Sequence, residues 1–495
     1  MKKRRLFPFL AAFLLLFLSA CQSTPTQSVV TGKDNRVFLE KAKKTAEVPA
    51  DTTPERVQYQ ENFTSTDESI TFRMDIDTVL PYETFPVVEA VPHFLTGEEV
   101  RQIAEIILPG ASFYDQNLNA NPRYSREDLK RKIALWSPYA TPEGVQTLLG
   151  TTSEVDAAEN QQYLENLKTN LKTWNTLLET APESSPLQPC TWTFRSAEAY
   201  GMEDQGDQEI CAVARTPALD YTLLANSRNQ PDFRLSSMEI QMGGDPTVNN
   251  LAVLRATLLR TGKPTQAEVS SASGKVQALL DQLNAANLGT WAISGTEILT
   301  QEVGDETEYE IYLKAGPVWE GHRAVKNQFA DHMVGADAYA ATYYQPGLVF
   351  SYSAHGDLVY FGMDSPMDAR QVLNANVALL PREELLQKAV SQLRLSDVKN
   401  AFGIPSSSML DHREELFGEK IRCEIEITSL SYDLGRIKAP GDDDTYYYVP
   451  LFVLSGMANY YGVDSGTLYL TSTDFGGIDL PLITLNAIDG TVVSF

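Results

Sequence analysis

The first residues of this chain restrict where it can fold, because they have the three parts of a secretory signal. Four basic residues at positions 2–5 precede an apolar stretch over positions 6–18, and the small residues Ser19 and Ala20 follow. The apolar stretch is shorter than the ~20 residues that a membrane-spanning helix needs. We therefore expect a signal peptide that is removed, so that the fold forms outside the cytoplasm.

Small residues directly before Cys21 resemble the lipobox of bacterial lipoproteins. The resemblance implies cleavage after residue 20 and acylation of Cys21 at its sulfur and its new N-terminus. Several acyl chains hold a protein stably at a bilayer, whereas a single chain is marginal. We expect a protein on the outer face of the cytoplasmic membrane, anchored by lipid at Cys21. An ordinary signal peptide with a chance cysteine is the alternative.

The charge of the chain argues against two classes of partner. The formal net charge is −25, and loss of the four basic signal residues lowers it by four to −29. Nucleic acid and anionic membrane surfaces both attract Lys and Arg, so neither is expected to bind this chain directly. The charge keeps the protein soluble near a polyanionic envelope or attracts a cationic partner.

Three cysteines follow Cys21, and two of them can form a disulfide. Cys190 and Cys211 each begin an apolar, strand-like run, and antiparallel pairing of these runs would bring the two side chains together. Disulfides form outside the cell, so this pair is our candidate disulfide. Cys423 is then a buried structural thiol.

Alternating and helical patterns predict an α+β fold with antiparallel sheets. Ile70, Phe72, Met74 and Ile76 alternate with polar residues, which is typical of a half-buried strand. A hairpin is expected over 347–361 and strands over 446–454 and 482–493. The polar residues 22–66 are expected to be a flexible tether.

Four helices are expected from caps and apolar spacing. Capping boxes at Thr96 and Thr265 begin two of them. The leucine-rich seam over 153–181 predicts a long helix with an internal packing face, and 381–395 predicts a helix that buries five apolar residues. These five are Leu385, Leu386, Ala389, Val390 and Leu393.

The order of these patterns suggests two or three modules, each of helix plus antiparallel sheet, after the signal and tether. The predicted boundaries are 1–20 (signal peptide), 21–66 (lipid-anchored linker), 67–150 (N-terminal module), 151–262 (long helix plus strands), 263–370 (middle module) and 371–495 (C-terminal module).

Several stretches together resemble an uncharacterised, domain-of-unknown-function family of lipoproteins from Gram-positive, clostridia-like bacteria. They are the 347–361 hairpin with Asp364-Ser365-Pro366, the helix at 382–393, and the strands at 448–453 and 485–493. The Asn-Ala-Ile-Asp-Gly sequence at 486–490 also resembles the closing strand of PepSY-type domains and of secreted regulators of envelope sensor kinases. The resemblance implies no catalytic residues.

No motif in the sequence points firmly to catalysis, a metal or a cofactor. The histidines lack zinc-helix spacing, and His322, Asp331 and His332 would bind zinc only if the fold gathered them. Ser396 and Lys399 match Ser-x-x-Lys, but the accompanying motifs of penicillin-binding proteins are missing. The acidic run 442–444 lacks EF-hand spacing. We therefore expect no catalytic, cofactor-binding or metal-binding residues.

Aromatic residues gather late in the chain and have two interpretations. Tyr446, Tyr447, Tyr448, Tyr460, Tyr461 and Tyr469 are suited to strands, and tyrosines also stack on sugars or anchor protein partners.

The sequence therefore predicts a lipid-anchored extracytoplasmic protein that binds, senses or regulates without catalysis, with an envelope protein or the cell wall as partner. Two other classes stay open. A solute-binding lipoprotein needs two lobes around a cleft. An envelope hydrolase with a dispersed site needs two carboxylates a few ångströms apart, and 65 acidic residues supply many candidates.

Overall fold

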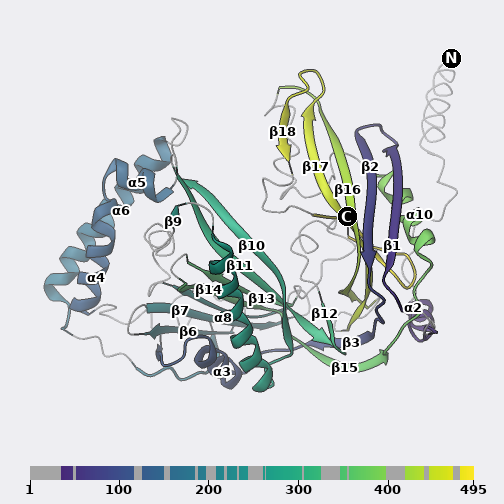
Figure 1. Ribbon diagram of the computed structural model, residues 1–495. Coiled ribbons are helices and arrows are strands. Elements are labelled where there is room, and N and C mark those ends of the chain that lie inside the picture. Colours follow the sequence, from purple (N-terminus) through teal and green to yellow (C-terminus); the bar gives the residue numbers. More distant parts are fainter. Residues whose placement is uncertain are drawn as a thin grey trace, which may run out of the picture.

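Alternating apolar and polar residues form the strands of two β-sheets, each packed against helices (Figure 1). The fold is therefore α+β, as the sequence predicts. The computed structural model describes residues 35–47, 52–115, 125–149, 157–183, 188–196, 208–216, 220–230, 234–242, 260–261, 264–303, 306–324, 346–353, 356–396, 418–439, 445–471 and 480–494.

The first sheet has nine strands and combines the two ends of the described chain. Its main order is β1 (Glu55–Thr64), β2 (Ile70–Leu80), β16 (Ile421–Lys438), β17 (Tyr446–Gly462), β19 (Leu480–Asn486) and β20 (Val492–Ser494). Three further strands join it, namely β3 (Val87–Pro92), β15 (Met367–Asn374) and β18 (Leu468–Thr471). All of its strand pairs are antiparallel except β2 with β16, which run parallel.

The second sheet has eleven strands, all from the middle of the chain. Its main order is β10 (Trp291–Val303), β11 (Glu306–Trp319), β13 (Gly347–Tyr352), β14 (Leu358–Asp364), β8 (Arg234–Met242), β7 (Asp220–Asn229), β6 (Gln208–Arg215) and β4 (Ser112–Asp115). The short strands β5 (Arg195–Ser196), β9 (Arg260–Thr261) and β12 (His322–Arg323) pair at its margins. The predicted hairpin over 347–361 is confirmed as β13 and β14, in the register Gly347 opposite Asp364.

The two sheets divide the chain into two lobes that do not follow the predicted order of modules. Lobe 1 consists of residues 35–92 and 367–494, and lobe 2, residues 93–366, is inserted into it. The predicted boundaries at 67, 150 and 262 therefore do not coincide with a change of sheet, whereas the one at 370 lies four residues after the crossing at 366. Only strand pairing between segments far apart in sequence, such as β2 with β16, defines lobe 1.

The chain crosses between the lobes twice, and the two crossings contact each other. The His93 amide donates to the Pro366 carbonyl at 2.9 Å. The His93 ring lies between Asp368 of lobe 1 (Nδ1 to Oδ2, 2.9 Å) and Glu99 of lobe 2 (Nε2 to Oε1, 3.0 Å). Beside them, the rings of Trp319 and Tyr448 pack with centroids 5.0 Å apart. Hydrogen bonds and an aromatic contact therefore connect the two lobes.

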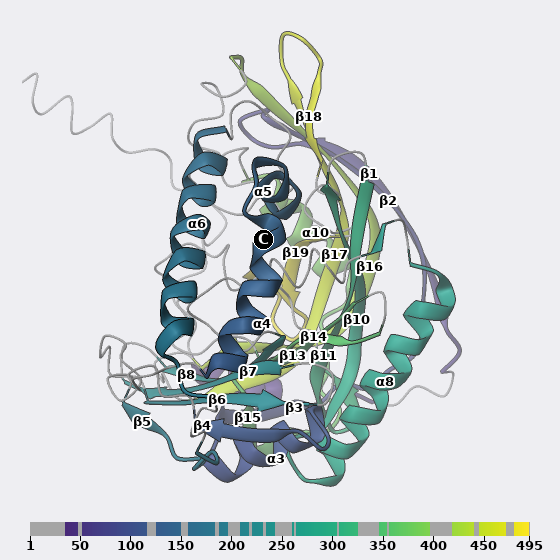
Figure 2. The same ribbon diagram turned by 90° about the vertical axis from the view of Figure 1, so that its left-hand side faces the viewer.

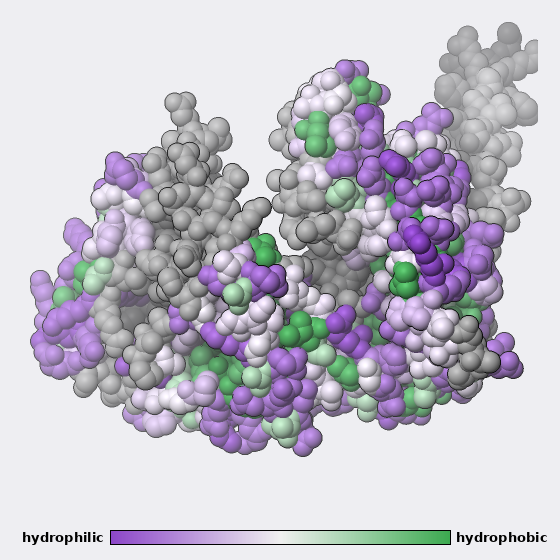
Figure 3. Space-filling view, viewed as in Figure 1, coloured by the Kyte–Doolittle hydropathy of each residue, from purple (hydrophilic) through white to green (hydrophobic). Residues whose placement is uncertain are grey.

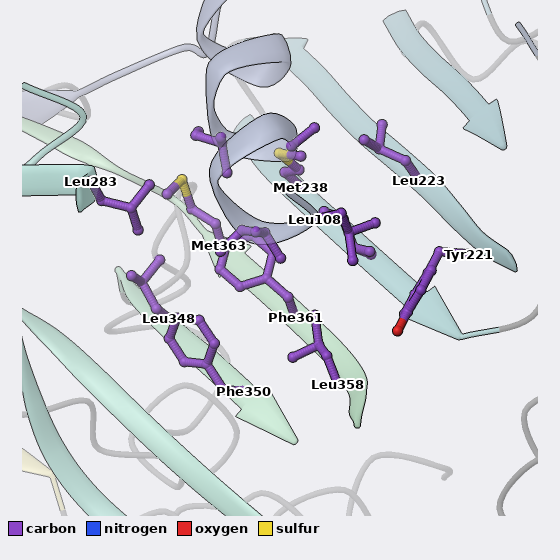
Figure 4. Packing of buried hydrophobic residues seen from close by; sticks show 14 of the residues in the cluster. Leu108, Tyr221, Leu223, Met238, Leu283, Leu348, Phe350, Leu358, Phe361 and Met363 are labelled. Carbon is purple, nitrogen blue, oxygen red and sulfur yellow. The ribbon is translucent and has the colours of Figure 1, made fainter. Parts of the chain in front are cut away.

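Helices α3 (Gly97–Ile107) and α8 (Gln266–Ala285) cover one face of the second sheet. Both begin with the predicted capping boxes, at Thr96 with Glu99 and at Thr265 with Glu268. Figure 4 shows their core, in which Phe361 and Phe350 lie under α3 with ring centroids 5.2 Å apart.

Helix α10 (Arg382–Leu393) covers the corresponding face of the first sheet. It buries the five predicted residues, which pack against β2, β16, β17 and β19. On β2, Ile70, Phe72, Met74 and Ile76 are buried as the alternation predicts.

The predicted tether is wrong for residues that form part of lobe 1. β1 pairs with β2 over its whole length, and helix α2 (Asn35–Ala42) buries Phe38 and Ala42 in a core with Val87 and Tyr447. β1 is mostly polar because one of its faces is exposed, and the surface over β1 and β2 is largely hydrophilic (Figure 3). Strand pairing, rather than composition, orders this segment. Residues 22–34 lie outside the described residues.

The long predicted helix is α6 (Ala157–Thr180), and it packs within a separate helical unit. It lies against α4 (Arg126–Trp136) and α5 (Pro142–Leu149), with the 3₁₀ turn Ser137–Tyr139 between them. Leu167 and Trp174 of the seam are buried against Leu129 and Trp136, which confirms an internal packing face. Figures 1 and 2 place this unit on the side of the second sheet opposite α3.

Candidate functional site

The face of the second sheet that turns away from α3 and α8 carries polar side chains on its central strands. Met238, Ile240 and Met242 of β8 enter the core, so Glu239 and Gln241 point to the opposite side. The same alternation on the neighbouring strands adds Tyr312 and Lys314 of β11, Ser351 of β13, and Tyr360 and Asp364 of β14. We call Glu239, Gln241, Tyr312, Tyr360 and Asp364 the carboxyl–tyrosine cluster; each of these side chains is half-buried.

Strand register brings the members of this cluster together across four strands. Tyr312 is opposite Ser351, Ser351 is opposite Tyr360, and Tyr360 is opposite Gln241. One step along the sheet, Glu239 is opposite Gly362. Neighbours in such a row have Cβ atoms about 5 Å apart, so these side chains lie next to one another on one face of the sheet.

Gly362 makes room for the Tyr360 side chain in the centre of the cluster. A Cβ atom at position 362 would lie 2.6 Å from the Tyr360 hydroxyl oxygen and 2.9 Å from its Cε1. The Tyr360 side chain therefore lies over the glycine. Any larger residue at 362 would displace the tyrosine.

Burial and a neighbouring carboxylate make Glu239 an unusually weak acid. Burial raises the pKa of Glu239, the negative charge of Asp364 raises it further, and a hydrogen bond from Gln241 (Nε2 to Oε2, 3.1 Å) partly opposes them. The pKa of Tyr360 is also raised, by burial and then by Glu239, Asp364 and Tyr312. The cluster therefore disfavours extra negative charge.

A third carboxylate, that of Glu310, lies at the margin of the cluster. The Ser351 hydroxyl donates to Oε2 of Glu310 at 2.6 Å, and both side chains are buried. Lys314, on the same face of β11, is also buried. Charged groups are rarely buried without partners, so this half of the sheet is built around polar contacts rather than around apolar packing.

The raised pKa of Glu239 predicts a stability effect with a definite pH dependence. The unfolded carboxyl ionises near its ordinary value of 4.5, below the folded one, so Glu239 destabilises the fold as pH rises through this interval. We expect Glu239→Gln to raise the unfolding temperature at pH 7.5 and to change it little at pH 4.

Glu98, whose pKa is lowered instead of raised, provides the control for this prediction. Arg101 and Gln102 hold the pKa of Glu98 at about 2, so Glu98→Gln should give no gain at pH 7.5. Thermal unfolding of both variants at the two pH values checks the prediction, and an equal gain for Glu239→Gln at both would contradict it.

The structure describes only some of the other residues that the sequence singled out. The His322 ring packs on Phe85, with centroids 5.5 Å apart, while Asp331, His332, Lys399 and the acidic run 442–444 lie outside the described residues. Among the residues that the structure does describe, no three His, Cys, Asp or Glu side chains gather as a metal site.

The late tyrosines are strand residues in the structure, most of them buried. Tyr446, Tyr448 and Tyr460 are buried in lobe 1, and the Tyr469 hydroxyl donates to Glu419 at 2.6 Å. The Asn-Ala-Ile-Asp-Gly sequence forms a turn in which Asn486 Oδ1 accepts from the Ile488 amide at 3.0 Å. These residues therefore have structural contacts.

Cys190 and Cys211 are free thiols in the structure, so the predicted disulfide is not present in it. The two thiols are nevertheless near each other, because the Cys190 charge contributes to raising the pKa of Cys211 after burial and Glu209. Residues 191–194 are not a strand, which removes the direct pairing on which the prediction depended. Burial also raises the pKa of Cys190 to about 12, and such a thiol is slow to oxidise.

Cys21 and the signal segment lie outside the described residues. Over the described part of the chain, every helix is too short or too polar to cross a bilayer.

The sequence alone did not single out Glu239, Tyr360 and Asp364. The available signal was an acid within an apolar strand, as in the run Met238-Glu239-Ile240, and the alternation at 360–364. Neither signal shows that the two strands are neighbours.

Comparison with known proteins adds no function. No family model matches the chain, and no curated protein matches it. A solved structure of an uncharacterised protein from Eubacterium rectale is similar over 93% of this chain and 99% of that one, at 9% identity and a TM-score of 0.38. A likeness this weak carries no argument.

Proposed function

We propose that this protein is a lipid-anchored binding protein on the outer face of the cytoplasmic membrane, which senses or regulates at the envelope and binds its ligand at the carboxyl–tyrosine cluster. The observation that carries the proposal is the half-buried set of polar side chains on rigid strands, on the sheet face that the core does not use. Sites built on strands hold their groups more accurately than sites on loops.

The chemistry of the cluster favours a ligand rich in hydrogen-bond donors. Glu239 and Asp364 accept hydrogen bonds, Gln241 both donates and accepts, and the tyrosines offer a hydroxyl and an aromatic face. Hydroxyl, amide or ammonium groups of cell-wall fragments and peptides match this set. The signal segment, Cys21 and the charge of −25 support an address at the envelope.

The proposal predicts that uncharged replacements in the cluster weaken binding. The lipidated protein would be tested against muramyl peptides, chitooligosaccharides and short cationic peptides by calorimetry. We expect one class to bind, and Glu239→Gln and Asp364→Asn to weaken it at least tenfold, because each removes a charged acceptor worth about 1.5–3 kcal/mol.

Glu98→Gln, on the exposed surface of α3, is the matched control and should bind as the unaltered protein does. Binding that is equally strong in both cluster variants would contradict the proposed site. Turnover of any probe would contradict a purely binding role.

An envelope hydrolase is the second candidate, and the carboxyl pair favours it. Because Glu239 is opposite Gly362 and Asp364 is opposite Ser237, the two acids are diagonal neighbours, with Cα atoms about 7–8 Å apart. Glycosidases place two carboxyl groups roughly 5–9.5 Å apart, one with a raised pKa as the acid, and the charge of Asp364 raises the pKa of Glu239. In this candidate Glu239 is the acid, and the same two variants lose turnover. The solute-binding alternative has no comparable observation in its favour.

A further inference from the structure

A groove runs between the edge strand β1 and helix α10 in lobe 1, away from the carboxyl–tyrosine cluster. Its volume is about 390 Å³, and it is lined by Glu55, Arg56, Val57, Gln58, Tyr59, Arg382, Glu383, Leu386 and Gln387. One wall is therefore strand backbone and the other is the side of a helix. We call it the β1–α10 groove.

β1 has an edge that is open to another strand. It pairs with β2 along all ten residues without a bulge, and no strand in the described part of the chain pairs with its other side. Natural sheets usually protect such an edge with proline, a bulge, a very short strand or charged side chains. β1 has neither a proline nor a bulge and is ten residues long, and its charged residues are Glu55, Arg56 and Glu61.

Most of the charged residues beside this edge form ion pairs within lobe 1, while Glu383 adds an exposed carboxylate to the groove lining. Arg382 binds both oxygens of Glu55, at 3.0 and 2.6 Å. Arg394 binds Glu61 at 3.2 Å. Each pair joins α10, or the residue after it, to β1, so these charges do not repel an incoming uncharged strand.

Arg56, on the other face of β1, also pairs with a charged residue of lobe 1. It makes two hydrogen bonds to Asp77 of β2, at 2.7 and 2.6 Å. The charged residues of β1 therefore interact within lobe 1, and among the described residues only β2 pairs with the β1 backbone as a strand.

The residues that line the groove can contact every second side chain of a strand added beside β1. Val57 and Leu386 form buried apolar surface, Tyr59 is half-buried, and Gln387 is exposed on α10. A strand added to β1 would lie about 4.8 Å from it and point every second side chain toward α10. An uncharged, apolar or hydroxyl-bearing side chain suits this lining.

We propose that the β1–α10 groove binds an extended, largely uncharged segment of a partner polypeptide, which adds to the first sheet as a strand beside β1. Main-chain hydrogen bonds would supply affinity, and the side chains that face α10 would supply specificity. This gives the protein a surface for a protein partner that is separate from the proposed ligand site.

The test uses the complete lipidated protein and a library of linear ten-residue peptides. A selected peptide would be titrated by fluorescence polarisation, with hydrogen exchange of residues 55–64 measured in its presence. We expect Gln387→Trp, which fills the groove from an exposed position, to weaken binding at least tenfold. Glu384→Trp, also exposed on α10 but outside the groove lining, should stay within about twofold, and the peptide should slow exchange in β1.

The possible results separate the alternatives. Failure to select any peptide, binding that Gln387→Trp leaves intact, or exchange protection elsewhere would each overturn the proposal. Concentration-dependent dimers that protect β1 would assign the edge to a second copy of the chain and overturn the partner segment. Glu239→Gln should bind the peptide normally, so failure here is distinguishable from failure of the proposed ligand site.

Discussion

Replacing Phe361 by alanine should lower the free energy of unfolding of lobe 2 by about 3–5 kcal/mol. The Phe361 ring is fully buried, lies at the centre of the core under α3, and packs on Phe350 (Figure 4). Truncation removes the apolar burial of the ring and leaves a cavity that strands held on both sides cannot close, because β14 is paired with β13 and β8.

Urea unfolding followed by tryptophan fluorescence measures this effect, since Trp291 is buried in the same core. Val79→Ala is the control, because Val79 is 60% exposed, and it should change stability by less than about 0.5 kcal/mol. A loss below about 1 kcal/mol for Phe361→Ala would show that this core is not packed as described. The loss of stability should appear in the unfolding transition of lobe 2, because lobe 2 has its own hydrophobic core.

Gly456→Ala should lower the free energy of unfolding of lobe 1 by about 3 kcal/mol or more. Gly456 lies in β17 opposite Ile427, beside the bulge that shifts the register of β16. A Cβ atom at position 456 would lie 1.8 Å from the Glu426 carbonyl oxygen and 2.9 Å from the Ile427 Cα. Backbone cannot move aside as a side chain can, so β16 and β17 would separate locally and lose ladder hydrogen bonds.

A glycine-to-alanine substitution in α8 provides a control, because we expect it to change the free energy of unfolding in the opposite direction. Gly274 lies within α8, and a Cβ atom there would meet no atom within 4 Å. Gly274→Ala should therefore stabilise the protein by about 0.5–1 kcal/mol, because alanine loses less backbone entropy in a helix. Thermal and urea unfolding of the two variants test the pair. Equal and small effects would mean that β17 does not approach β16 as closely as the structure has it.

Local sequence patterns correctly predicted the helices and strands whose signal spans only a few residues or helical turns. The alternation at Ile70–Leu80, the five buried residues of α10, and the two capping boxes are all confirmed. In each case the period of the side chains and the chemistry of a helix end are local properties. The seam of α6 was predicted as an internal face for the same reason, and α4 and α5 cover it.

These local patterns could not predict which strands from distant parts of the sequence pair with each other. The polar strand β1 has little apolar signal, yet pairing with β2 and packing under α10 place it in a sheet. The parallel pairing of β2 with β16 joins residues that are about 350 positions apart and makes lobe 2 an insertion. Many strands share the same alternation, so the alternation does not choose among them.

The candidate site illustrates the same division. The sequence by itself determined the acidic charge, the α+β class and which face of each strong helix or strand is apolar, since these depend on composition and short-range periodicity. Only the tertiary structure decided that Glu239 and Asp364, 125 residues apart, are neighbours with Tyr360 on one half-buried face. Their chemistry depends on burial and mutual charge, which exist only after β8 and β14 have paired.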